Sequence, residues 1–127
     1  MDPRLGWKLM FRVKDRKKAE NRLQHAQQLL GRELRVANCE QYSKMPELWT
    51  CDATTRLDGQ TASEQVLDCL LQANRLATGW YTLGLNLTPD QRLESFSGIF
   101  SLRRGSNTRL SGLEWAAFDS RTMPGGD

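Results

Sequence analysis

Residues 7–13, Trp-Lys-Leu-Met-Phe-Arg-Val, alternate Trp, Leu, Phe and Val with Lys, Met and Arg. A two-residue period is typical of a strand that buries one face. After Asp15 the apolar spacing changes to four, three and four, carried by Ala19, Leu23, Ala26 and Leu30. These side chains share one side of a helical wheel, and Gly31 then supplies a helix end. Residues 7–31 therefore predict a strand followed directly by an amphipathic helix.

The same two periods continue through the rest of the chain. Alternation predicts strands over residues 34–39, 48–57, 80–87, 93–102 and 113–118. Thr61-Ala62-Ser63-Glu64 matches the S/T-x-x-E capping box, in which two side chains satisfy free backbone N–H groups. A second helix is therefore expected to begin there. Apolar residues cover more than half of its wheel, which predicts burial against the sheet and against a second element.

The resulting order, β-α-β-β-α-β-β-β, predicts an α+β fold. Its first six elements match the ferredoxin-like split β-α-β arrangement (β-α-β-β-α-β), and two further antiparallel strands are expected to extend that sheet. We find no internal repeat and no linker, so residues 1–121 are expected to form a single α+β domain. Residues 122–127 are expected to form a flexible C-terminal tail.

Length and composition set further limits on the class of protein. With 127 residues, 39% of them hydrophobic, the chain is long enough to bury a core. No apolar run approaches the roughly 20 residues that span a bilayer, and the run at 9–11 is too short for a signal peptide, so no membrane association is expected. Cys39, Cys51 and Cys69 form no C-x-x-C pair. An odd, unpaired set favours reduced thiols in a cytoplasmic protein.

Residues with catalytic or metal-binding chemistry are scarce. His25 is the only histidine and is expected on the exposed flank of the first helix, while the cysteines lack the spacing of a zinc site. The chain has neither a G-x-S-x-G nucleophile motif nor a glycine-rich phosphate loop. Asp52 and Glu114 are expected to face solvent on separate strands. We therefore expect no enzymatic activity and no bound cofactor or metal.

The net charge of +3 is distributed unevenly. Residues 1–36 carry ten Lys or Arg and four Asp or Glu, a net +6, whereas residues 37–127 carry eight and eleven, a net −3. This asymmetry supports the hypothesis of a nucleic-acid-binding protein that uses the first helix and the 103–109 loop. The simpler explanation is a solvated helix face. The basic residues concerned are Lys14, Lys18, Arg22, Arg103, Arg104 and Arg109.

One form of nucleic-acid binding is disfavoured by the strand sequences. Ferredoxin-like RNA-binding sheets stack bases on aromatic side chains of their open face. The polar side of the first strand instead offers Lys8, Met10 and Arg12, and the strand at 48–57 offers no aromatic residue on its polar side either. Both stacking platforms are therefore missing.

The later strands carry large apolar side chains that need not all be internal. Trp80 has the opposite alternation phase from Tyr81 and the leucines that follow, and Phe96 and Phe100 oppose Ile99 in the same way. One of these sets is expected to face away from the helices. An open apolar face of this kind is typical of a protein-binding surface. The alternative is that the late strands curl and bury both faces.

Elimination favours a non-enzymatic protein-binding module. The most specific hypothesis is an inhibitor such as a bacterial immunity protein, which neutralises a cognate toxin by occluding its active site. A basic toxin would meet acidic side chains, and an acidic toxin would meet the basic helix flank. The sequence leaves the oligomeric state open. The predicted partner-binding residues are Lys14, Lys18, Arg22, Trp80, Asp90, Glu94, Phe96, Phe100, Arg103, Arg104, Arg109 and Glu114.

Overall fold

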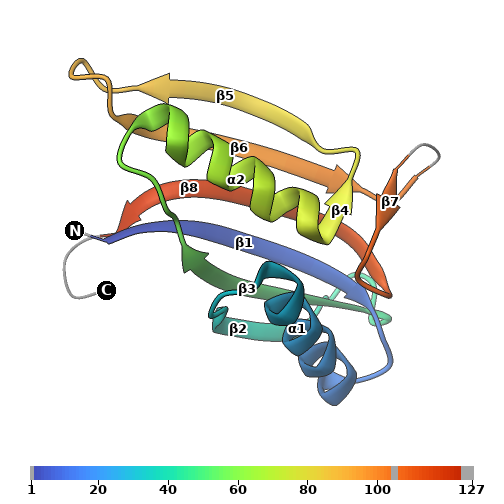
Figure 1. Cartoon of the computed structure of the whole chain (residues 1–127). Coiled ribbons are helices and arrows are strands. Elements are labelled where there is room, and N and C mark those ends of the chain that lie inside the picture. Colours follow the sequence, from blue (N-terminus) through green and yellow to red (C-terminus); the bar gives the residue numbers. More distant parts are fainter. Residues whose placement is uncertain (1, 104–105, 124–127) are drawn as a thin grey trace.

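A computed structural model describes residues 2–103 and 106–123 (Figure 1). All the strands and both helices expected from the sequence are present, and two short strands, β4 and β7, are added. The elements are β1 (Asp2–Arg12), α1 (Arg16–Leu30), β2 (Arg35–Gln41), β3 (Leu48–Arg56), α2 (Ala62–Leu76), β4 (Ala77–Thr78), β5 (Tyr81–Leu87), β6 (Leu93–Ser101), β7 (Asn107–Thr108) and β8 (Leu113–Met123). Strand β8 thus includes the first two residues of the expected tail, and the rest of that tail lies outside the described residues.

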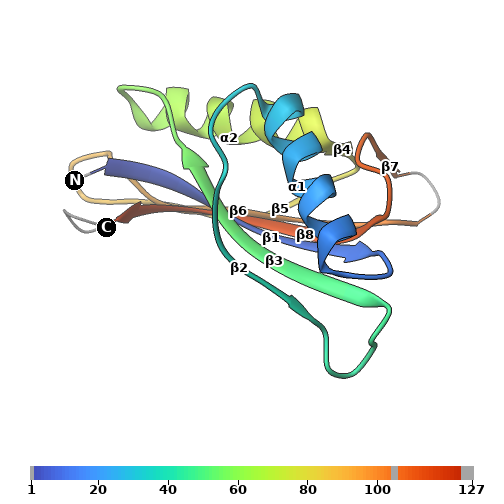
Figure 2. The same cartoon turned by 90° about the horizontal axis from the view of Figure 1, so that it is seen from below.

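Six strands form one sheet in the order β2-β3-β1-β8-β6-β5, and every neighbouring pair is antiparallel. Figure 2 shows both helices on the same face of this sheet, and the opposite face carries no helix among the described residues. The α+β class is therefore confirmed. Strands β4 and β7 pair separately, close to the end of α2.

The ferredoxin-like order is not confirmed by the second half of the sheet. Strands β2, β3 and β1 follow the split β-α-β order, but the place beside β1 belongs to β8. In a ferredoxin-like sheet, the strand after the second helix would take that place. Here that strand, β5, forms a hairpin with β6 and lies at the far edge. Periodicity shows that a strand exists but carries no information about its neighbour, which explains the difference.

The core lies between the sheet and the helices. Leu5, Leu9 and Phe11 of β1 are fully buried on the face that the helices cover. Beside them Phe118 packs onto Gly98 of the neighbouring strand, where a Cβ atom would overlap the phenyl ring. Burial of these large side chains provides the main driving force for folding.

The start of α2 and the end of α1 follow the sequence signals, and α1 begins at a side-chain cap formed by Asp15. The Asp15 side chain accepts a hydrogen bond from the Lys18 backbone N–H, at 2.9 Å, and Gly31 ends α1 with a left-handed φ of 71°. At α2, Thr61 and Glu64 form the expected reciprocal capping box. Each contact satisfies backbone groups that the helix itself leaves unpaired.

A polar cluster joins the two helices above the sheet. Arg32, just after α1, donates to both carboxylate oxygens of Asp68 on α2, at 3.0 and 3.1 Å, and also to the Arg56 carbonyl. Asp68 further accepts from the Asp58 backbone N–H and from the Gln72 amide. Because both Arg32 and Asp68 are largely shielded from solvent, this bidentate pair fixes α1 relative to α2.

Candidate protein-binding surfaces

The most apolar exposed region lies along β5 and the outer side of α2. Among the described residues, seven of the ten exposed large hydrophobic side chains belong to these two elements. We call this region the β5–α2 surface. Its members are Leu67, Leu70, Leu71, Tyr81, Leu83, Leu85 and Leu87.

Strand β5 exposes apolar side chains on both faces of the sheet. Leu83 pairs with Ser97, but Leu85 pairs with Phe96, so Gly84 is an extra residue in the ladder. Gly84 has a φ of 39°, a conformation that suits glycine. Because Phe96 points into the core, Leu85 lies on the helix-covered face, while Leu83 lies on the open face. The bulge therefore distributes the leucines over both sides of one edge strand.

Helix α2 adds three exposed leucines, of which Leu70 faces the β5 edge. Its inner face consists of Cys69, Ala73 and Leu76 together with Gln72. Asp68 faces α1, as its bond to Arg32 shows. Leu70 lies two residues later, about 200° around the helix, and so points away from α1 toward the β5 edge. Leu67 and Leu71, at 56% and 52% exposed, point outward.

The β5 edge has little charge. The strand itself contains no ionisable group other than the Tyr81 phenol. At one end the Arg103 guanidinium lies 4.4 Å from the Tyr81 ring centroid, a cation–π contact. At the other end, the turn into β6 carries Asp90, whose carboxylate accepts from the Thr88 hydroxyl and lies 3.2 Å from Arg92. The hydrogen bond from Thr88 lowers the pKa of Asp90, so it stays ionised.

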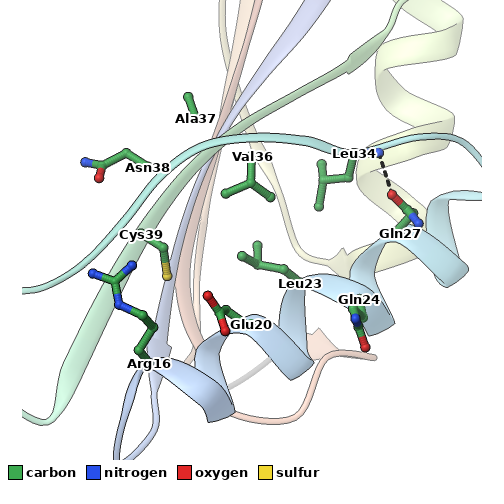
Figure 3. A pocket seen from close by; sticks show the side chains of 10 residues that line it. All are labelled: Arg16, Glu20, Leu23, Gln24, Gln27, Leu34, Val36, Ala37, Asn38 and Cys39. Carbon is green, nitrogen blue, oxygen red and sulfur yellow. Dashed lines mark hydrogen bonds between the residues drawn. The ribbon is translucent and has the colours of Figure 1, made fainter.

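The opposite edge of the sheet has a different character. A groove of about 480 Å³ runs between α1 and β2 (Figure 3). Leu23, Leu34 and Val36 form its apolar floor together with Cys39, and the Leu34 backbone N–H donates to the side chain of Gln27. The rim carries Arg16, Glu20, Gln24 and Asn38. The groove can hold an apolar side chain, but its surroundings are polar and charged.

The structure corrects the prediction for the aromatic residues. Phe96 and Phe100 are 6% and 0% exposed and lie on the helix-covered face, so the expectation that they belong to an open binding face was wrong. Trp80 is half-buried, and its indole N–H donates to the carbonyls of Ala73 and Ala77. The large residues of opposite phase, Tyr81 and Leu83, are the ones that face outward. Alternation had separated the two sets but could not show which one the helices cover.

The charged residues predicted to bind a partner do not form one site. Lys14, Lys18 and Arg22 belong to the α1 half of the molecule, whereas Arg103 and Arg109 belong to the segment between β6 and β8. Arg104 lies outside the described residues. On the acidic side, Glu94 is exposed on β6. Glu114 forms an ion pair with Arg12 on the open face.

The cysteines are placed as internal thiols. Cys39 and Cys51 lie opposite each other on β2 and β3, with 2.8 Å between their sulfurs, and Cys69 is fully buried. Burial, together with the hydrogen bond between Cys39 and Cys51, raises the pKa of the Cys51 thiol, and burial raises the pKa of Cys69 to about 12. Thiols held protonated in this way are poor nucleophiles at neutral pH.

The described residues contain neither a metal-binding group nor a membrane-spanning helix. Within the described residues, no group of three or more His, Cys, Asp or Glu side chains is arranged to hold a metal ion. Neither helix of that part of the chain is long and apolar enough to cross a membrane. Comparison with protein-family models, curated proteins and solved structures gives no significant match to the chain.

Proposed function

We propose that this chain is a non-enzymatic protein-binding module and that the β5–α2 surface is where it binds. The observation that carries the proposal is the concentration of seven exposed leucine and tyrosine side chains on one edge strand and its neighbouring helix. Soluble proteins rarely gather this many large apolar side chains in water, because covering them gains about 25 cal/mol for each Å² of apolar surface. An unpaired strand edge also offers free backbone groups to a partner.

The most specific form of this proposal is an inhibitor, such as a bacterial immunity protein, that occludes the active site of a cognate toxin. Strand β5 is held by its ladder with β6, so it presents a preformed apolar edge whose ordering costs a partner little. Asp90 and Glu94 flank the Leu87 end of this edge. Arg92 pairs with Asp90, so this end carries a net charge of −1, which would favour the basic active-site cleft of an enzyme that acts on nucleic acid.

A nucleic-acid-binding role through α1 is the second candidate. The first turn of α1 carries Arg16, Lys17 and Lys18 and no acidic residue. Helix N-termini are already electropositive, so three cations there concentrate positive charge at one point. Such binding would be driven by phosphate contacts and would weaken steeply as the salt concentration rises.

Affinity capture from the native cell tests both roles. The intact chain, a Leu71→Glu variant of the β5–α2 surface and a Val36→Lys variant of the opposite edge would be compared at physiological salt. We expect the intact chain and Val36→Lys to retain one protein in similar amounts. Leu71→Glu should retain at least tenfold less of that protein. For the inhibitor form, co-expression of that protein without the chain should arrest growth, and the intact chain should relieve the arrest.

Two results would count against the proposal. Equal retention by all three chains would show that the β5–α2 surface is not the binding site. Recovery of nucleic acid alone, released between low and physiological salt, would favour the second candidate instead.

A further inference from the structure

We infer that a second copy of this chain occupies the β5–α2 surface, through antiparallel pairing of the two β5 edges. The inference rests on the proposed function in one respect, since it takes this surface to be a protein-binding one. It goes further by naming the occupant and the geometry, and it applies to the purified chain with no other protein present.

The distribution of leucines around β5 indicates edge-to-edge pairing. Leu83 and Tyr81 lie on the open face of the sheet, and Leu85 lies on the helix-covered face. A partner docked flat on either face would cover only one of these sets. A strand that continues the sheet covers both, because its own side chains extend over the two faces alternately. Among the described residues, no strand pairs with the outer side of β5.

The chemistry of the edge suits an identical strand. Tyr81–Leu87 contains no charged side chain, so two copies brought together face no like-charge repulsion. Antiparallel pairing of identical edge strands places the two-fold axis perpendicular to the sheet. Both copies then keep their helices on the same side of the continuous sheet, and Leu70 of each α2 lies on the side of its helix that faces the paired β5 strands. One symmetry operation thus brings the apolar residues of both elements together.

The area that an edge-to-edge dimer can cover lies near the lower limit of specific interfaces. The seven side chains of the β5–α2 surface are between 38% and 58% exposed. Leu67 and Leu71 point away from the sheet, so edge pairing covers only the other five, and full burial of those five in both copies removes on the order of 900 Å². Backbone pairing along the two β5 strands adds to this area.

A dimer of this form makes the second copy a competitor of any other protein that binds the same surface. It covers the leucines until such a partner is present, and the partner then has to displace it. Capture of that partner is therefore expected to fall as the concentration of the chain rises above its own dissociation constant.

Sedimentation equilibrium of the purified chain between 1 and 100 µM tests the inference. We expect a mass twice the 14.5 kDa of the chain for the intact protein and for Val36→Lys on the β2 edge. Leu85→Lys is expected to sediment as a monomer, with dimer dissociation raised at least a hundredfold, because it places two lysines at the paired edge. Circular dichroism should show all three chains equally folded, since Leu85 and Val36 are similarly exposed, at 54% and 48%.

The inference is overturned if the intact chain stays monomeric at 100 µM, or if Leu85→Lys dimerises as the intact chain does. A monomer that still captures a partner sensitive to Leu71→Glu would remove the dimer and leave the proposed function standing. If the intact chain dimerises but Leu71→Glu captures the same proteins as the intact chain, the dimer stands and the proposed function is removed.

Discussion

The two edges of the sheet have the same construction but different surfaces. Both β2 and β5 are seven residues long, both are interrupted by a bulge, and each lies on the half of the sheet covered by one fifteen-residue helix. Strand β2 carries Arg35 and Glu40, and Arg35 pairs with Glu33 just before the strand. Strand β5 carries leucines and no charge.

Charged side chains on an edge strand discourage pairing with another chain. The β2 edge has this protection and the β5 edge does not, although the fold would allow it on both. The same contrast extends to the helices, since the leucines of α1 are buried or partly buried whereas α2 exposes three of its own. This difference supports the proposal that another chain covers the β5 half.

Truncating a leucine on each helix should give the largest difference between the two halves. Leu30→Ala on α1 removes a side chain that is 2% exposed and should lower the free energy of unfolding by about 2–5 kcal/mol. Leu71→Ala on α2 should change it by less than about 0.5 kcal/mol, because that side chain is mostly in water already. Urea unfolding at one low chain concentration measures both, since association would add to apparent stability. Equal losses would show that Leu71 is a core residue of the monomer.

Breaking the contact between the halves should have an intermediate effect. Asp68→Asn removes the charge that Arg32 binds with two hydrogen bonds and should cost about 2 kcal/mol, less than a fully buried pair would. Glu33→Gln, which removes the exposed pair with Arg35, is the matched control and should cost less than about 0.5 kcal/mol. Chemical denaturation of the two variants measures these losses of unfolding free energy. If the loss for Asp68→Asn is no larger than that for Glu33→Gln, apolar packing alone holds the helices together.

Lowering the pH should produce the smallest effect, through Asp58 in the polar cluster between the two helices. The hydrogen bond from Arg56, and the charges of Arg32 and Arg56, lower the pKa of Asp58 below its ordinary value of 3.8. The unfolded chain then binds this proton more tightly than the folded one, so the contribution is complete above pH 3.8 and is lost as the pH falls toward the lowered value. Because the side chain is 47% exposed, we expect less than about 1 kcal/mol. Asp58→Asn should remove that part of the acid dependence in unfolding measured between pH 2 and 6.

Local features of the fold could be predicted from the sequence, and global ones could not. The Thr61 cap, the Gly31 helix end and the strand periods depend on a few adjacent residues, and all are present. The position of β8 beside β1 depends on contacts across the whole chain, which periodicity does not report.

For the same reason, only part of the β5–α2 surface could be predicted from the sequence. The opposite phases of Trp80 and Tyr81 showed that one set of apolar residues had to face outward. The wide apolar face of α2 predicts burial, and this prediction is wrong for Leu67 and Leu71, which are exposed. The signal for this edge is the run Tyr81–Leu87. It has four large apolar side chains and no charge, and it follows a helix with exposed leucines.

The central pair of the sheet has a consequence for how the chain folds. Strands β1 and β8 join the two halves, and partners such as Leu9 and Ala116 are more than a hundred residues apart in the sequence. Closing so long a loop costs entropy before any contact compensates for it, so the rate of folding is expected to be limited by this step. During synthesis the apolar hairpin of β5 and β6 would leave the ribosome before its inner neighbour exists. Chaperone protection in that interval matters more for this half than for the other.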